Sequence, residues 1–209
     1  MPYVVGHFAS RNLYPIFTFH MLDGEQNLVK RAIRGDSSAF GTLYDHYQAA
    51  IYRFVAVKVG RREEAEDITH QVFLSAWQNV RGYKHRGHPF SSWLYQIARN
   101  QVIDFYRAQK NEVSLDKFDP ESFVLPASVH LDLSVKLEME KVHGAIKQLK
   151  VDYQDVIIMR FVEDISLKET AAILRKTEGA VKLLQHRAVR ELKKILGEED
   201  KEEDNEPEL

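Results

Sequence analysis

The chain contains no cysteine among its 209 residues. This absence excludes disulfides, thiolate zinc sites and a cysteine nucleophile, and it favours a reducing compartment, so we expect a cytoplasmic protein. No apolar run is long enough to span a bilayer, and the first twenty residues lack the unbroken apolar core of a signal peptide. Period-two alternation is also missing over any useful length. Together these absences favour an all-α protein with no membrane insertion.

Charge is distributed unevenly along the chain. The net charge is -2, yet residues 198–209 alone hold eight acidic residues and one lysine. The remainder carries 28 basic and 23 acidic residues, a net charge of +5, so the overall balance does not argue against a nucleic-acid partner. The acidic tail has almost no apolar residues, and we expect it to be disordered and to act as a solubilising segment.

Helical periodicity divides the chain into two parts. Residues 23–110 read as four helices, and residues 135–197 read as a second set that ends in a helix-turn-helix. Between them, residues 111–134 contain prolines and acids with few periodic apolar positions, which is typical of a flexible linker. We expect residues 1–22 to be a disordered extension. The fold prediction is two small helical bundles joined by that linker.

Residues 164–193 have the pattern of a helix-turn-helix. Ser166 and Glu169 have the spacing of a capping box, so a helix should begin near Leu167. Thr177 then offers the N-cap of a second helix, whose polar side is basic. The basic side suits duplex DNA, although an ordinary helical hairpin with a solvated basic face would give the same pattern. The basic residues around the rest of that second helix are Lys182, His186, Arg187, Arg190, Lys193 and Lys194.

The helix predicted for residues 63–80 has two distinct sides. One side carries an apolar stripe that can pack on the rest of the bundle, formed by Ala65, Ile68, Val72 and Ala76. The opposite side gathers Asp67, His70, Leu74 and Trp77. A leucine and a tryptophan beside a carboxylate and an imidazole suit the binding of a partner protein. The alternative is that Trp77 packs under the following loop.

Basic and aromatic residues alternate after that helix, at Tyr83, Lys84, Arg86, His88, Phe90 and Trp93. Such a mixture suits single-stranded nucleic acid, because cations follow the phosphates while rings stack on unpaired bases. His85 and His88, with His70 as a third residue, could be read as metal ligands. No acid or cysteine completes a recognisable ligand spacing, so we reject a metal site and expect no cofactor.

Taken in order, three of these segments resemble a bacterial RNA polymerase sigma factor of the extracytoplasmic-function (ECF) type. The sequence AEDITHQVFLSAW at 65–77 resembles the core-polymerase-binding helix of that family. FSSWLYQIARNQVIDFYR at 90–107 resembles its promoter-melting segment, and TEGAVKLLQHRA at 177–188 resembles its recognition helix. The likeness extends over 25–196, apart from the connector. Three motifs in the right order are far more specific than any one of them.

The resemblance implies a role for each motif. It implies that the beta-prime clamp helices of core RNA polymerase are bound by Asp67, His70, Leu74 and Trp77. It implies capture of a flipped base of the minus-ten promoter element by Tyr83, Lys84, Arg86, His88, Phe90, Trp93 and Asn100. It implies that the minus-thirty-five element is read by Lys182, His186 and Arg187, with Arg190 nearer the phosphates. The implied function is promoter recognition, DNA melting and initiation of transcription, without enzymatic activity and with an anti-sigma factor as a candidate further partner.

The chain departs from the family pattern at a few positions. His70 and Gln71 replace a frequent glutamine-glutamate pair. Arg175 stands where a glycine commonly ends the first helix of the helix-turn-helix. Residues 183–185 replace a frequent small-basic-apolar run, which leaves open whether Gln185 faces DNA. The alternative function is a helix-turn-helix transcriptional regulator with a helical effector or dimerisation domain, which would not explain the side at 67–77 or the aromatic loop.

Overall fold

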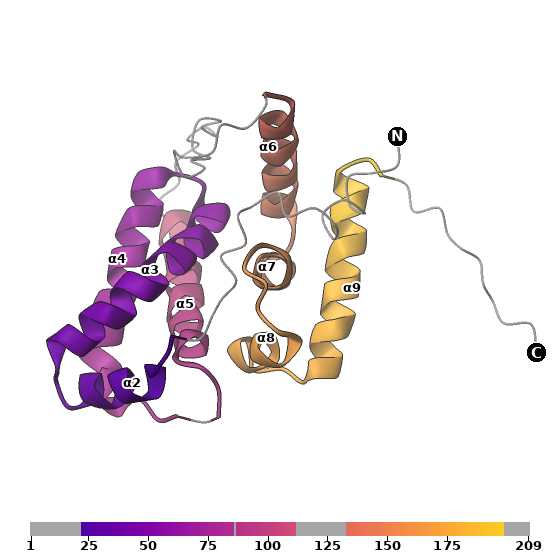
Figure 1. Ribbon diagram of the computed structural model, residues 1–209. Coiled ribbons are helices and arrows are strands. Elements are labelled where there is room, and N and C mark those ends of the chain that lie inside the picture. The colour runs from indigo at the N-terminus through magenta and orange to yellow at the C-terminus, as the bar shows by residue number, and fades with distance from the viewer. Residues whose placement is uncertain (1–21, 86, 112–132, 199–209) are drawn as a thin grey trace, which may run out of the picture.

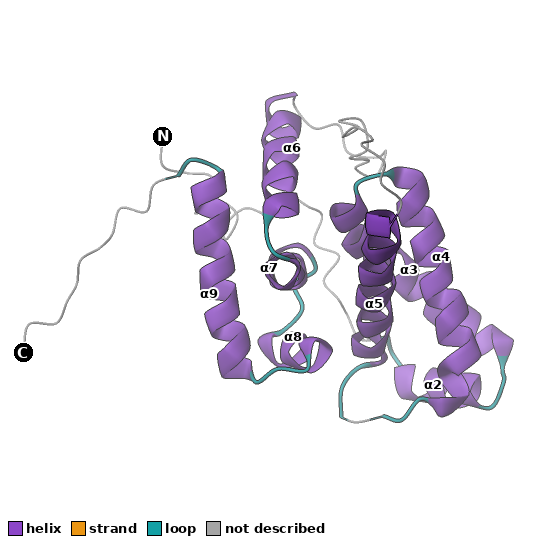
Figure 2. Ribbon diagram, turned by 180° about the vertical axis from the view of Figure 1, so that it is seen from behind, coloured by secondary structure: helices purple, strands orange, loops and turns teal. Residues whose placement is uncertain are grey.

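The computed structural model describes residues 22–85, 87–111 and 133–198, and within these ranges all regular structure is helical (Figures 1 and 2). The elements are α2 (Glu25–Ile33), α3 (Ser37–Val59), α4 (Arg62–Asn79), η1 (Val80–Gly82), α5 (Phe90–Asn111), α6 (Leu133–Gln148), α7 (Val151–Ile157), the π-helical turn η3 (Ile158–Val162), α8 (Leu167–Leu174) and α9 (Glu178–Ile195). The predicted all-α class is confirmed. Within the same ranges, none of the helices combines the length and the apolarity needed to cross a membrane.

Two groups of helices lie side by side in both ribbon views, α2 to α5 and α6 to α9 (Figures 1 and 2). We call the described residues 22–111 the first half and residues 133–198 the second half. The expectations of a disordered extension, a flexible linker and a disordered acidic tail fall almost entirely on 1–21, 112–132 and 199–209, which lie outside the described residues.

The long helix α3 organises the first half. Asp36 caps its start, because its Oδ1 accepts the backbone N–H of Ala39 at 3.1 Å, and Gly60 ends it in the left-handed conformation with φ 82°. The sequence alone predicts Asp36 as the cap and Gly60 as the end of this helix, and both predictions are confirmed. It also predicts one apolar stripe along the helix, and all members of that stripe are buried against α4 and α5: Phe40, Leu43, Tyr47, Ile51 and Phe54.

The helix-turn-helix forms at α8 and α9. Ser166 and Glu169 make the predicted capping box, and Thr177 caps α9 by accepting from the N–H of Ala180 at 3.2 Å. Arg175 ends α8 in the left-handed conformation with φ 54°, so an arginine occupies the position where glycine is usual. The sequence favours Asp152 as the N-cap of α7, and this prediction is wrong. Lys150 is the N-cap residue, and Asp152 lies in the first turn.

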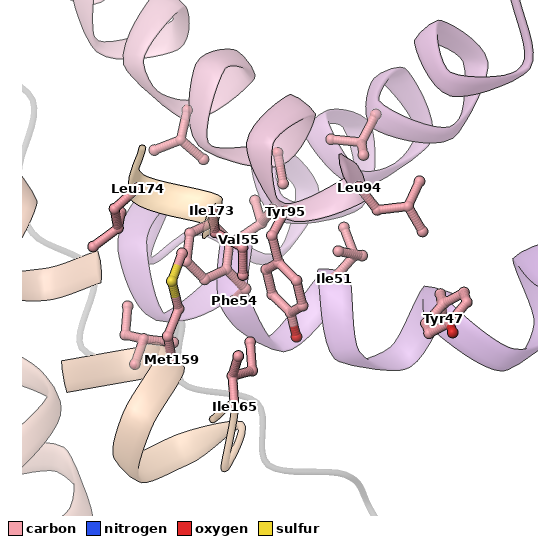
Figure 3. Close-up of a cluster of buried hydrophobic side chains, with 14 of the residues drawn as sticks. Tyr47, Ile51, Phe54, Val55, Leu94, Tyr95, Met159, Ile165, Ile173 and Leu174 are labelled. Carbon is pink, nitrogen blue, oxygen red and sulfur yellow. The ribbon is translucent and has the colours of Figure 1, made fainter. Parts of the chain in front are cut away.

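One apolar core runs through both halves. Figure 3 shows Phe54 and Val55 of α3 and Tyr95 of α5 beside Met159, Ile165, Ile173 and Leu174 of the second half. Ile51, Leu94 and Tyr47 continue the same cluster into the first half. The prediction of two bundles included no such contact. The bundles therefore exist as sets of helices, but in this arrangement they pack directly against each other.

Buried ion pairs reinforce the contact between the halves. The ammonium of Lys58 on α3 donates to Asp155 Oδ1 on α7, and both side chains are almost fully buried. Arg99 on α5 donates to Asp155 Oδ2 at 2.6 Å and to Asp152 Oδ1 at 2.8 Å. Burial lowers the pKa of Lys58, and the carboxylate of Asp155 opposes that change. Asp152 thus holds a cation of the other half instead of capping its own helix.

A second ion pair lies beside η3. Arg53 on α3 binds Glu163 with two parallel hydrogen bonds of 2.9 Å and 2.8 Å. Burial raises the pKa of the Glu163 carboxyl, whereas Arg53 acts to lower it. His143 on α6 adds a contact of 3.0 Å between its Nε2 and the backbone oxygen of Val57. The contact between the halves therefore combines an apolar centre with polar groups of matched charge.

Candidate functional site

The outer side of α4 is open to solvent at three of its four predicted positions. Asp67 and His70 are exposed, and Leu74 is 47% exposed. Trp77 is half-buried, because its ring packs on the ring of Phe40 with centroids 5.0 Å apart. The opposite stripe of α4 is buried as predicted. Trp77 thus belongs partly to the packing of α4 on α3, and the exposed apolar area of this side comes mainly from Leu74.

Three rings close together follow η1. Tyr83, Phe90 and Trp93 form a triangle, with ring centroids 5.1 to 5.4 Å apart. The mixture of cations and rings in the sequence predicts an exposed stretch, but Phe90 is only 1% exposed, so this prediction is wrong for Phe90. Its ring also meets Tyr47 of α3, which explains the burial. Tyr83 and Trp93 are half-buried, so part of each residue is accessible to solvent.

The buried carboxylate of Glu25, at the start of α2, ties this ring cluster to the core. It accepts the backbone N–H of Phe90 at 2.9 Å and the hydroxyl of Tyr47. Burial, with the nearby Glu25 as a second cause, raises the pKa of Tyr83 to about 12. Sequence reasoning missed Glu25, because an acid in the first turn of a helix usually needs no partner beyond the helix itself. The ring cluster is consequently held in one position by a buried polar contact.

The remaining residues of the predicted minus-ten site lie around this cluster. Lys84 is exposed and His88 is half-buried, while Arg86 lies outside the described residues. Asn100 is exposed on α5 two turns after Trp93, so both side chains project from one side of that helix. A groove of about 80 Å³ opens next to Tyr83 and is lined by Glu25, Gln26, Val29, Lys30, Ile33, Tyr83 and His85. Nowhere in the described ranges do three or more histidines and acids gather in a way that would hold a metal ion.

The second helix of the helix-turn-helix presents its cations to solvent. Val181, Ala188 and Leu192 are buried, and the exposed side carries all four predicted residues: Lys182, His186, Arg187 and Arg190. Gln185, whose orientation the sequence left open, is half-buried and accepts a hydrogen bond of 3.2 Å from Arg160 Nε. The rotation of α9 is thereby fixed, with Gln185 turned toward the second half.

The chain matches two known family models and is similar in sequence to known proteins. The family model described as Sigma-70 region 2 matches residues 43–112, and the model described as Sigma-70, region 4 matches residues 139–192. The chain is 31% identical to the ECF RNA polymerase sigma factor SigW of Bacillus subtilis, over 80% of this chain and 94% of that protein. It is 34% identical to the ECF RNA polymerase sigma factor BldN of Streptomyces coelicolor, over 81% of this chain and 64% of that protein.

Solved structures share the fold. A structure of CnrH in complex with the cytosolic domain of CnrY has a TM-score of 0.65 at 22% identity, and the match covers 84% of this chain and 98% of that chain. The sigma factor RpoE in complex with the anti-sigma factor NepR from Bartonella quintana has a TM-score of 0.62 at 21% identity, covering 76% of this chain and 96% of that chain. At these identities the likeness concerns the fold alone.

Proposed function

The chain belongs to the ECF RNA polymerase sigma factors, which direct promoter-specific transcription. We propose which surface of the chain binds the polymerase and which surfaces bind the two promoter elements. The family consists of non-catalytic transcription factors, so nucleotide addition belongs to the polymerase in the cytoplasm. We assign polymerase binding to α4, the minus-ten element to the aromatic loop with α5, and the minus-thirty-five element to α9. The observation that carries this division is that three exposed surfaces of different chemistry occur on one chain. A regulator with an effector domain is not favoured, because the first half matches Sigma-70 region 2.

Polymerase binding is assigned to the outer side of α4 because Leu74 is exposed there without a role in the core. A double change of Asp67→Arg and Leu74→Ala should abolish association with core polymerase while helicity stays unchanged. Glu66→Arg is the matched control, since it reverses the same charge on the flank of the same helix and breaks only an exposed pair with Arg62. Unchanged affinity of the double variant would overturn this assignment.

Strand opening is assigned to the half-buried rings of Tyr83 and Trp93. Stacking of one base on a protein ring contributes roughly 1 to 3 kcal/mol, comparable with the free energy that unpairs one or two positions. Tyr83→Ala and Trp93→Ala should therefore impair transcription from a duplex promoter and be rescued by a template with a pre-opened bubble. An equal defect on both templates would mean that the rings serve packing alone. Phe90 packs against both rings and is buried in the core. It is unsuited to this test, because truncating it would leave a cavity in the core.

Readout of the minus-thirty-five element is assigned to Lys182, His186 and Arg187 in the first half of α9. A side chain that reads a base edge typically contributes about 1 to 3 kcal/mol toward the correct sequence. Arg187→Ala should accordingly weaken some promoter sequences more than others. Arg190→Ala, one turn further on, should weaken all sequences alike, as a phosphate contact does. If both variants weaken every sequence equally, Arg187 is also a phosphate contact.

With its two halves packed together, the chain is too short to reach both promoter elements at once. Elements centred near -10 and -35 lie about 25 base pairs apart, or about 85 Å along B-DNA. A compact chain of this length has a radius of gyration of only about 17 Å. We therefore propose that the halves separate in the initiation complex.

The absence of native cysteine makes separation of the halves directly measurable. Asp45→Cys on α3 and Glu191→Cys on α9 are exposed positions that can carry a donor and an acceptor dye. Energy transfer between the dyes should fall when the labelled chain joins core polymerase and a promoter. Unchanged transfer in an active complex would contradict the separation.

We also propose an anti-sigma factor as a partner of this chain. CnrH was solved with the cytosolic domain of CnrY, and the Bartonella quintana RpoE with the anti-sigma factor NepR. Co-purification from the native host, followed by loss of transcription when the purified partner is added, tests the proposal. A co-purifying protein that leaves transcription unchanged is not an anti-sigma factor.

A further inference from the structure

Leu183 lies in the middle of the exposed side of α9. It is about two and a half helical turns from the buried Leu192, which puts the two leucines on opposite sides of the helix. Its neighbours one and two turns further along the same side are Arg187 and Arg190. Leu183 is 51% exposed, so it contributes little to the core. An apolar side chain thus lies among cations on this side of α9.

The next two residues, Leu184 and Gln185, point away from the exposed side of α9. Leu184 is half-buried and packs against the core, and Gln185 binds Arg160. Of residues 183–185, Leu183 is thus the one whose side chain is free to contact an external surface. The exposed side chain among these three positions is therefore apolar.

The first turn of α9 permits a close approach to that surface. Gly179 and Ala180 are both exposed, and Gly179 lies one turn before Leu183 on the same side. A Cβ built on Gly179 meets no atom within 4 Å, so packing inside the protein does not require glycine there. Glycine inside a helix nevertheless lowers stability by roughly 0.5 to 1 kcal/mol relative to alanine. Small side chains at this end allow Leu183 to reach deeper into a groove than a bulky first turn would.

We propose that Leu183 contacts the 5-methyl group of a thymine in the major groove of the minus-thirty-five element and so selects a T·A pair at one position. This inference rests on the proposed role of α9 in reading that element. The surrounding cations match the charge of the DNA backbone, and thymine is the base that presents a methyl group in the major groove. Leu183 therefore supplies apolar readout beside the polar readout by its neighbours.

Deoxyuridine provides a direct test, because it differs from thymidine only by that methyl group. The experiment uses the complex with core polymerase and a promoter selected from a library with a randomised upstream element. Each thymine of the minus-thirty-five element is replaced in turn by deoxyuridine, and the dissociation constant is measured. Burial of one methyl group predicts an approximately fourfold loss of affinity at one position.

Leu183→Ala should abolish that preference for thymine over deoxyuridine, while alanine preserves the helix. Leu137→Ala is the matched control, since Leu137 on α6 is also 51% exposed but belongs to a different helix, and the preference should survive it. Equal affinity for both bases at every position in the unchanged chain overturns the inference. So does a preference that persists in Leu183→Ala, or an effect of Leu183→Ala on self-association alone.

The same measurements distinguish failure of this inference from failure of the proposed function. If Arg187→Ala still weakens sequence-selective binding while deoxyuridine has no effect, α9 reads the element and Leu183 does not contact a methyl group. If neither Arg187→Ala nor deoxyuridine changes binding to any sequence, α9 is not the recognition helix and both proposals fall.

Discussion

The core of the first half and its contact with the second half are built from different chemistry. Inside the first half, α3 packs on α4 and α5 through apolar residues such as Leu43 and Ile51. Between the halves, an apolar centre is accompanied by buried charges, among them Lys58 and Asp155. A buried charge pair gains little over full hydration of both ions, whereas apolar surface is always more stable out of water. Because part of its area is charged, the contact between the halves is therefore better suited to separation than the core of the first half.

The largest expected effect comes from removing one member of the buried charge cluster. Asp155→Ala leaves the ammonium of Lys58 buried without its counter-ion, and such a change typically lowers the free energy of unfolding by about 3 to 5 kcal/mol. Urea denaturation measures the loss, and small-angle scattering should show a larger radius of gyration as the halves separate.

A matched control for this variant is Asp104→Ala, which removes an exposed carboxylate paired with Arg107. Its effect should stay below about 1 kcal/mol. If Asp155→Ala were equally mild and equally compact, the buried pair would not hold the halves together.

An apolar truncation inside the first half should behave differently. Leu43→Ala removes buried methyl groups and should lower the free energy of unfolding by about 3 kcal/mol, because the cavity fills only partly. Scattering should show an unchanged radius of gyration under native conditions. A larger radius for Leu43→Ala as well would remove the distinction between the two contacts.

Acid should weaken the contact between α6 and α3 through His143. Burial, with Lys147 as a second cause, lowers the pKa of His143 to about 4, whereas an unfolded histidine titrates near about 6.5. The unfolded state then binds more protons between these values, so the stabilisation is complete above pH about 6.5 and is lost as the pH falls toward 4. Between pH 8 and pH 5 the loss is about 2 kcal/mol. His143→Gln should flatten this part of the stability profile, and parallel profiles for both chains would contradict the role of His143.

The smallest effect on stability is expected when the buried pair becomes apolar. A double change of Lys58→Met and Asp155→Leu should alter the free energy of unfolding by only about 1 kcal/mol in either direction, since both charges of the pair are removed together and Arg99 keeps its ion pair with Asp152. The contact would then resemble the core of the first half. Separation should become harder, and transcription should fall although the chain is stable. Full transcription from this variant would show that the chemistry of the contact does not control opening.

Much of the fold was predictable because its causes are local. The stripe of α3, the capping box at Ser166 and the cap at Thr177 each depend on residues within a few turns of one another. The exposed side of α9 followed from the same periodicity. Local pattern also identified the outer side of α4, although it could not show that Trp77 packs on Phe40.

The remainder depends on residues far apart in sequence. The ring of Phe90 is buried against Tyr47 of another helix, and Glu25, 65 positions away, accepts its backbone N–H. Lys58 is buried because Asp155, 97 positions away, supplies its counter-ion. In the sequence, Lys58 near the end of a helix reads as a solvated cation at a helix C-terminus. No window of neighbouring residues contains the partner that reverses this interpretation.

The charges at the contact between the two halves also determine which halves of different chains can bind each other. In each ion pair that crosses between the halves within the described residues, the first half supplies the cation and the second half supplies the acid. Two copies of the same half thus repel each other at this face, and only unlike halves attract. Once the halves open, two chains can exchange their second halves and form a reciprocal domain-swapped dimer with the same ion pairs. Such dimers should increase with protein concentration in sedimentation experiments, and Asp155→Ala should suppress them.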